Sequence, residues 1–277
     1  MISAIPSPSG SEEIIKKFLK KLINVETYED SIGNLVVHKS GTGKKVMLIC
    51  GIDEDAIVAL SQEKDKIYFN HLGNKKLYPG TLVSINASDG YICAKDDKIP
   101  LENQYIGMVS DDEVTPGTSG VIFSEYFEDD NYIKGSRIGK VCVINEMITL
   151  ANNYTGELDL YIVFEVQSLF NHKGALVASN IINPEFTITF EEIESGDKDL
   201  LLIKAAKGYI SPQNGESFFE KAELKPYADT DLEITASFVK NSVVSVVGVP
   251  VKFASYPSSY IYKEVKEKIE KLFEIIF

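Results

Sequence analysis

The chain has 277 residues, 44% of them apolar and 25% charged, which is enough for one large globular domain or a domain carrying a smaller insert. Its formal net charge of −13 disfavours nucleic acid and anionic membrane surfaces as partners, and no run approaches the roughly 20 apolar residues of a membrane-spanning helix. Three widely spaced cysteines, and an opening stretch without the pattern of a signal peptide, favour a cytoplasmic protein with reduced thiols.

The chain opens with a predicted helix. Ser9 and Glu12 have the spacing of a capping box, and apolar residues then recur at helical spacing from 14 to 23. Next, residues 46–50 form an apolar run that is typical of a buried strand. Asp53 follows the end of this strand, where an acidic residue more often caps or turns the chain than serves a function.

Short strands with frequent turn signals extend from about residue 61 to residue 133. This pattern predicts a small β-barrel-like insert over 61–133, so that 1–60 and 134–277 together form the main domain. An acidic loop at 125–130 within the insert is more simply a solvated loop than a cation site.

The second half of the chain alternates predicted strands and helices, which favours an α/β domain. A helix is predicted over 141–150, a strand that ends near Gln167 follows, and a second helix begins near Lys173. A further helix is predicted over 218–224, and an amphipathic helix over 265–276 is expected to pack on the sheet.

Residues 163–175 read VFEVQSLFNHKGA and resemble the V-F-T-V-Q-E-E-V-G-x-x-G-A signature of the co-catalytic metallo-aminopeptidases. This family comprises glutamyl and tetrahedral aminopeptidases and endoglucanase M (cellulase M). Further matches in order and spacing occur at 6–10, at 183–191 (NPEFTITFE) and at 248–250 (GVP). The resemblance implies a three-layer α/β domain with a mixed sheet, plus an inserted β domain that mediates assembly in relatives.

The resemblance also implies a pair of metal ions, and here most of the ligand positions carry other residues. The family's general base falls at Ser168, and a bridging aspartate is replaced near Arg137 or Lys140. The remaining ligand positions read Gly51, Leu169, Glu191 and Ser255. A co-catalytic zinc pair needs a dense set of His and carboxylate ligands, and Glu191 alone of these keeps that chemistry.

A vestigial cleft without a catalytic residue is therefore expected, formed by Asp53, Glu54, Ser168, Glu191, Asp231 and Ser255. No metal is expected to bind, and Glu191 and Asp53 are the weak candidates for ligands. His172 lies close to this cleft in the sequence, although a single histidine there is more often a surface residue at a helix start. With Ser168 it could suggest a nucleophile and base, but the G-x-S-x-G elbow is missing.

Loss of the base and most ligands within an intact frame predicts an aminopeptidase-like and cellulase M-like protein that is catalytically inactive. It would act by binding or assembly, as a homo-oligomer or together with an active paralogue. One alternative is a divergent metal-dependent aminopeptidase or other hydrolase with a rebuilt site that uses zinc or cobalt. The other is a peptide- or carbohydrate-binding module in the vacated cleft.

Overall fold

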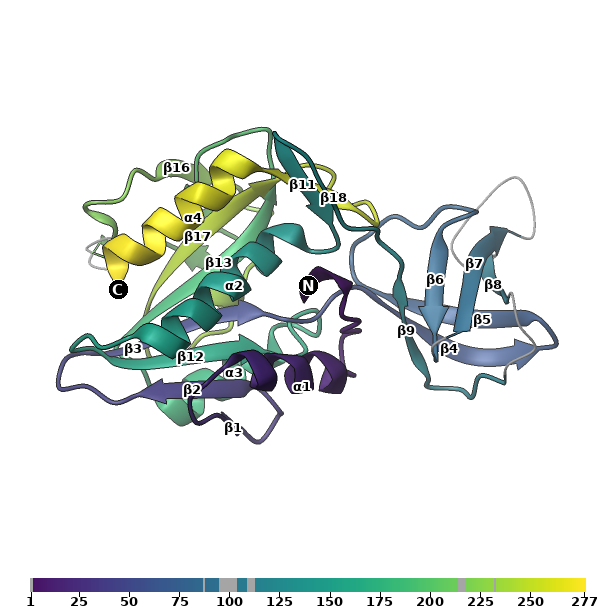
Figure 1. The fold of residues 1–277 in the computed structure, drawn as a ribbon, viewed down its shortest axis with the longest axis horizontal. Coiled ribbons are helices and arrows are strands. Elements are labelled where there is room, and N and C mark those ends of the chain that lie inside the picture. Colours follow the sequence, from purple (N-terminus) through teal and green to yellow (C-terminus); the bar gives the residue numbers. More distant parts are fainter. Residues whose placement is uncertain (1, 87, 95–103, 109–112, 214–217, 232) are drawn as a thin grey trace.

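A mixed β-sheet forms the centre of the larger part of the molecule in the computed structural model (Figure 1). The structure describes residues 2–86, 88–94, 104–108, 113–213, 218–231 and 233–277. Across the sheet the strands lie in the order β1 (Tyr28–Glu29), β2 (Leu35–Lys39), β12 (Asp159–Glu165), β3 (Lys45–Gly51), β13 (Phe186–Glu194), β17 (Val243–Val251), β14 (Leu201–Ala206) and β15 (Tyr209–Ile210), with β16 (Lys225–Ala228) paired to β14.

The four central strands β12, β3, β13 and β17 are parallel, so their carboxyl ends meet at one edge of the sheet. The outer strands β2 and β14 pair antiparallel to them. Central strands of this kind are covered on both faces and are therefore rich in apolar residues. β3 illustrates this, because every residue from Val46 to Gly51 is buried.

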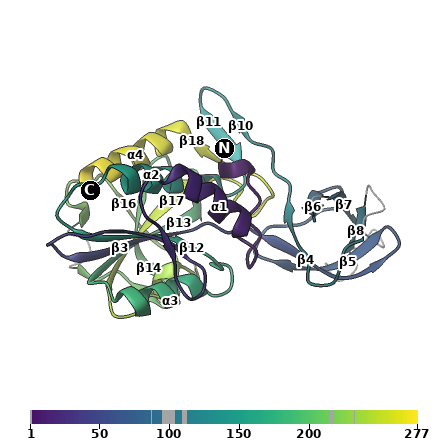
Figure 2. The ribbon, with the colours of Figure 1, turned by 60° about the horizontal axis from the view of Figure 1, so that its bottom comes forward.

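Helices cover both faces of the sheet (Figure 2). α1 (Glu13–Leu22), α2 (Ile138–Asn153) and α4 (Lys263–Ile276) lie on one face, and α3 (Lys173–Ile182) lies on the other. α4 buries Val265, Ile269, Leu272 and Phe273, which recur at helical spacing, as predicted. The predicted three-layer α/β domain with a mixed sheet is thus confirmed. None of the helices within the described residues is long and apolar enough to cross a membrane.

The smaller part is a closed antiparallel barrel, which lies beside the carboxyl edge of the sheet (Figure 1). Around the barrel the strands lie in the order β4 (Ala56–Glu63), β5 (Lys66–Leu72), β8 (Gln104–Met108), β7 (Ser88–Ala94), β6 (Leu82–Ile85) and β9 (Ser119–Ile122). The insert predicted from the frequent turn signals therefore exists. Its interior is apolar, with Ile57, Ile67 and Ile85 fully buried.

The borders of the barrel differ from the predicted 61–133. The barrel begins at Ala56, and its last strand ends at Ile122. Beyond it, β10 (Phe127–Glu128) and β11 (Tyr132–Gly135) join β18 (Ser259–Tyr262) in a separate three-stranded sheet. The partner strand lies more than a hundred residues further along the chain, so no local pattern separates β10 and β11 from the barrel strands.

Two local predictions were wrong. Ser9 does not cap α1, because Glu12 is the N-cap residue and makes no side-chain cap bond; the Ser9 hydroxyl donates instead to Asp53. The helix predicted over 218–224 is also not formed, and these residues make only a short 3-10 turn and bends. Short elements with few residues lack the cooperative hydrogen bonding that fixes longer helices.

Candidate functional site

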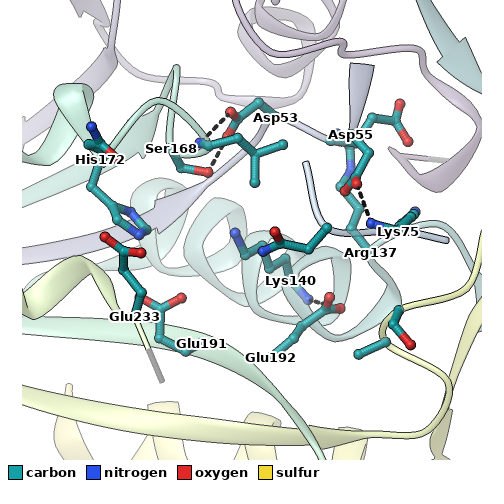
Figure 3. Close-up of a pocket in the computed structure, with 16 residues that line it drawn as sticks. Asp53, Asp55, Lys75, Arg137, Lys140, Ser168, His172, Glu191, Glu192 and Glu233 are labelled. Atoms are coloured by element: carbon teal, nitrogen blue, oxygen red, sulfur yellow. Dashed lines mark hydrogen bonds between the residues drawn. The ribbon is translucent and has the colours of Figure 1, made fainter. Parts of the chain in front are cut away.

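A cavity of about 380 Å³ opens at the carboxyl edge of the parallel strands (Figure 3). This edge is where ligands bind in open α/β sheets. The segments after β3, β12 and β17 and the end of β13 form its wall, together with the first turn of α2 and the barrel loop after β5. The lining residues of the main domain include Asp53, Glu54, Arg137, Lys140, Ser168, Leu169, His172, Glu191, Glu192 and Ser255, and those of the barrel loop are Asn74 and Lys75.

Asp53 ties three segments of the chain together at the wall of the cavity. Its carboxylate accepts hydrogen bonds from the Ser9 hydroxyl (2.6 Å), the Ser168 hydroxyl and the Leu169 backbone N–H (3.2 Å). The Asp53 side chain is 2% exposed, so these bonds take the place of water. Asp53 therefore has a structural role, and the hydroxyl proton of Ser168 is engaged in the hydrogen bond to Asp53.

Glu54 and Arg137 hold the next part of the wall. Glu54 accepts hydrogen bonds from the Ser7 backbone N–H (3.0 Å) and from the Ser136 hydroxyl. The Arg137 guanidinium donates to the backbone carbonyls of Ile52 and Ile5. Both side chains are buried, and their contacts are with the protein itself, although the Arg137 Nε has no hydrogen-bond partner. Neither side chain is arranged to act on a substrate.

The barrel is joined to the main domain beside the cavity. Asp55 accepts a hydrogen bond from the Lys75 backbone N–H (2.8 Å) and lies 3.3 Å from His71. The Lys75 ammonium donates to the Ser136 hydroxyl and to the carbonyl of Pro257 (3.1 Å). Burial raises the pKa of Asp55, but His71 and Lys75 outweigh it and hold that pKa below its usual value. The insert thus supplies part of the cavity wall.

The loop between β12 and α3 has an unusual backbone. Gln167, Asn171 and His172 all have positive φ, at 53°, 53° and 46°. Non-glycine residues rarely adopt this conformation, and such residues cluster at binding and active sites. Glu12 fixes the start of the loop, because its carboxylate accepts from the backbone N–H of Gln167 (2.9 Å). The loop is therefore held in a defined shape over the cavity.

His172 is oriented by its neighbours at one end of the cavity. Its Nδ1 lies 3.0 Å from the Thr235 hydroxyl and 3.6 Å from the Glu165 carboxylate. Burial by itself lowers the pKa of His172, but the hydrogen bond and charge of Glu165 and the charge of Glu191 raise it above its usual value. His172 thus lines the cavity rather than lying on the surface as the sequence suggested.

The raised pKa of His172 predicts a pH-dependent contribution to stability. A histidine whose pKa is raised by folding stabilises the folded protein. Its full contribution is present at pH values below the unfolded pKa of about 6.5 and is lost as the pH rises through the folded pKa. His172→Gln should therefore lower the melting temperature more at about pH 5.5 than at about pH 9. Thermal melts of both proteins across this range test it. A difference between them that does not change with pH would contradict it.

Lys140 lies in the middle of the cavity, between Asp53 and Ser168 on one side and Glu191 and Glu192 on the other (Figure 3). A Cβ atom added at Gly51 would lie 3.1 Å from the Lys140 Nζ and 2.7 Å from the Ser168 Oγ. Burial by itself lowers the pKa of Lys140, but Glu191, Asp53 and Glu192 raise it well above its usual range. The side chain is therefore an ammonium ion at neutral pH.

These residues do not fit a metal pair. Glu191 keeps a carboxylate, but its Oε1 accepts from the Thr235 backbone N–H (2.7 Å). In the part of the chain that the structure describes, no three His, Cys, Asp or Glu side chains are grouped so that they could hold a metal ion. The Lys140 ammonium would also repel a metal ion. The repulsion is about 4 kcal/mol for each unit of the ion's charge, at a separation of 4 Å and an effective dielectric constant of 20.

The predicted cleft residues come together with one exception. Asp53, Glu54, Ser168, Glu191 and Ser255 all line the cavity. Asp231 does not, because it lies in an exposed turn where its backbone N–H bonds to the Asp229 side chain (3.0 Å).

Sequence reasoning missed several lining residues. They are Asn74, Lys75, Asn171, Glu192 and Glu233. Two of them had a signal in the sequence. Asn171 lies within the signature-like stretch 163–175, and Glu192 directly follows the family's ligand position at Glu191.

Comparison with known structures defines the class of fold. The chain has the fold of the TET aminopeptidases and of an endoglucanase-type group with the same architecture. Pyrococcus horikoshii TET1 peptidase, a protein that can assemble into a tetrahedron or a large octahedral shell, matches 99% of this chain and 96% of its own with a TM-score of 0.89 and 20% identity. An endoglucanase from Thermotoga maritima matches 99% of this chain and 94% of its own with a TM-score of 0.80 and 22% identity.

Sequence comparison reaches the same group of proteins. A curated relative from Acetivibrio thermocellus, named as a candidate aminopeptidase, is 24% identical over 301 residues, which cover 95% of this chain and 90% of the relative. No family model matches the chain. The expected resemblance to TET aminopeptidases and endoglucanase M is thereby confirmed at the level of the fold.

Proposed function

We propose that this protein is an aminopeptidase-fold protein without metal-dependent peptidase activity, which acts by binding and assembly. The observation that carries the proposal is the content of the cavity. A lysine ammonium and a serine hydroxyl adjoin Gly51, the position where a ligand histidine would project, and the base position is Ser168. Hydrolysis by a metal pair needs both the ligands and a free base.

A rebuilt metal-dependent hydrolase is less well supported. It would use Asp53, Glu54, Glu191, Asp231 and His172. Asp231 lies outside the cavity, and the other four side chains all have hydrogen-bond partners within the protein. Each of these side chains would have to give up a contact that holds the fold before it could bind a metal ion.

A serine mechanism is disfavoured by the same contacts. The Ser168 hydroxyl donates to the Asp53 carboxylate, which also accepts from the Ser9 hydroxyl and the Leu169 backbone N–H and so ties the cavity wall together. A nucleophile needs a base that is free to take its proton. Lys140 lies close to Ser168 but is protonated, and His172 directs Nδ1 to Thr235 and Glu165. Neither Lys140 nor His172 is thus arranged to activate Ser168.

Assembly as a homo-oligomer is the second part of the proposal. The TET1 peptidase with the same fold can assemble into a tetrahedron or a large octahedral shell, and this chain retains a closed barrel insert. Binding through the cavity is compatible with such an assembly, because both signs of charge line it and suit a small polar ligand or a peptide. Pairing with an active paralogue would be the alternative form of assembly.

Peptidase assays test the catalytic part of the proposal. The purified protein should show no turnover above background on a panel of aminoacyl substrates, with or without added zinc or cobalt, while a TET aminopeptidase serves as positive control. Light scattering in the same buffer should give a mass of at least twice 30.7 kDa, the mass of one chain. Robust peptidase activity that a chelator abolishes would overturn the proposal.

A further inference from the structure

Without metal cations, the acidic side chains of this cavity outnumber its basic ones. Among the described residues that line it, six are acidic and three are lysine or arginine. Two of the three cations are engaged elsewhere, since Arg137 donates to backbone carbonyls and Lys75 to Ser136 and Pro257. Lys140 remains as the cation that faces the buried carboxylates.

The position of Lys140 is set by the fold. It belongs to the first turn of α2, where the backbone N–H groups of Gly139 and Lys140 donate to the Glu192 carboxylate at 2.7 and 3.2 Å. This contact anchors the helix start to β13. The Lys140 side chain then extends across the cavity to Gly51 at the end of β3.

The Lys140 ammonium faces several carboxylates and does not belong to a single ion pair. Asp53 lies just beyond the end of β3, and Glu191 and Glu192 lie on β13, so the negative charges come from two neighbouring segments of the sheet edge. No carboxylate of the described residues forms a direct salt bridge with Lys140, and its charge is balanced by several carboxylates together.

We propose that the Lys140 ammonium is a built-in replacement for a divalent metal ion, which balances Asp53, Glu191 and Glu192 and keeps this edge of the sheet folded without metal. Lys140 is then a positioning residue. It acts through the carboxylates and their segments rather than on a substrate. The glycine at position 51 follows from the same replacement, because a larger side chain there would meet Nζ.

The test replaces Lys140 with methionine, which keeps the length and packing of the side chain and removes the charge. The melting temperature of Lys140→Met should fall by about 3 °C in metal-free buffer at neutral pH. Excess Mn²⁺ should not restore that loss, because no three carboxylates of the described residues are grouped so that they could hold a metal ion. The wild-type protein should melt at the same temperature with Mn²⁺ or with a chelator. Lys173→Met, at an exposed lysine beside the same loop, is the matched control and should show no such loss.

A second variant separates the charge of Lys140 from its packing. Glu191→Gln removes one carboxylate and keeps an oxygen that can accept from Thr235. In the Lys140→Met background this change should raise the melting temperature, whereas in the wild type it should lower it. The double variant also provides a folded protein for measurement if Lys140→Met alone does not fold.

Two results would overturn the role of Lys140. One is a Lys140→Met protein with unchanged stability. The other is a Glu191→Gln effect of the same sign and size in both backgrounds. The inference rests on the proposed function, but different experimental results would contradict each of them. Peptidase activity that a chelator abolishes would contradict the proposed function. A Lys140→Met variant that is as stable as the wild type would contradict only the proposed role of this lysine.

Discussion

Replacing Asp53 with alanine is expected to destabilise the protein by about 3–4 kcal/mol, which corresponds to a fall in melting temperature of about 10 °C for a chain of this length. The change leaves the Ser9 hydroxyl, the Ser168 hydroxyl and the Leu169 backbone N–H without their acceptor in a buried place. Each such donor costs about 1 kcal/mol or more. Urea unfolding of the variant and the wild type measures the difference.

Asp231→Ala is the matched control for this prediction. Asp231 was grouped with Asp53 from the sequence, but it lies exposed in a turn outside the cavity. Its replacement should change the free energy of unfolding by less than about 0.5 kcal/mol. If both aspartates gave equal losses, Asp53 would not be the structural centre that the hydrogen bonds indicate.

Placing histidine at Gly51 is expected to destabilise the protein by about 2–3 kcal/mol without creating a metal site. A Cβ here meets the Ser168 Oγ at 2.7 Å, the Ser168 Cβ at 3.0 Å and the Lys140 Nζ at 3.1 Å, so both side chains must move. Chemical unfolding gives the loss, and zinc titration followed by calorimetry gives the binding.

Gly135→Ala controls for the loss of a glycine near the same cavity wall. Its added Cβ would make ordinary contacts, the nearest at 3.5 Å, and a cost below about 1 kcal/mol is expected. A Gly51→His protein that is as stable as the wild type and binds zinc tightly would show that the cavity still accommodates the metal site of its relatives.

The frame of the fold could be predicted because its signals are local and ordered along the chain. The apolar runs of β3 and β12 and the amphipathic pattern of α4 each specify their element, and the matching motifs give their order. The position of the site could be predicted from the same order of strands and motifs. Asp53 and Ser168 lie just beyond the ends of β3 and β12, and Glu191 lies on β13 beyond its last pair with β3, so the three come to one edge of the sheet.

The parts that could not be predicted depend on contacts between distant segments. The sequence placed Arg137 or Lys140 near the site without deciding between them, and only the docking of α2 against β13 shows that Lys140 reaches Gly51. The borders of the barrel depend on β11 pairing with β18, which lies far along the chain. Ser9 fits a capping motif, yet its hydroxyl bonds to a buried carboxylate supplied by another strand end.

Metal content per chain is the most direct test of the central claim that this cavity contains a lysine in place of a metal pair. The protein is dialysed against excess zinc or cobalt and then against metal-free buffer, and elemental analysis counts the ions that remain. The account predicts retention near zero for the wild-type chain. Retention of one or more ions per chain would contradict it and would mean that the cavity holds ligands arranged for a metal after all.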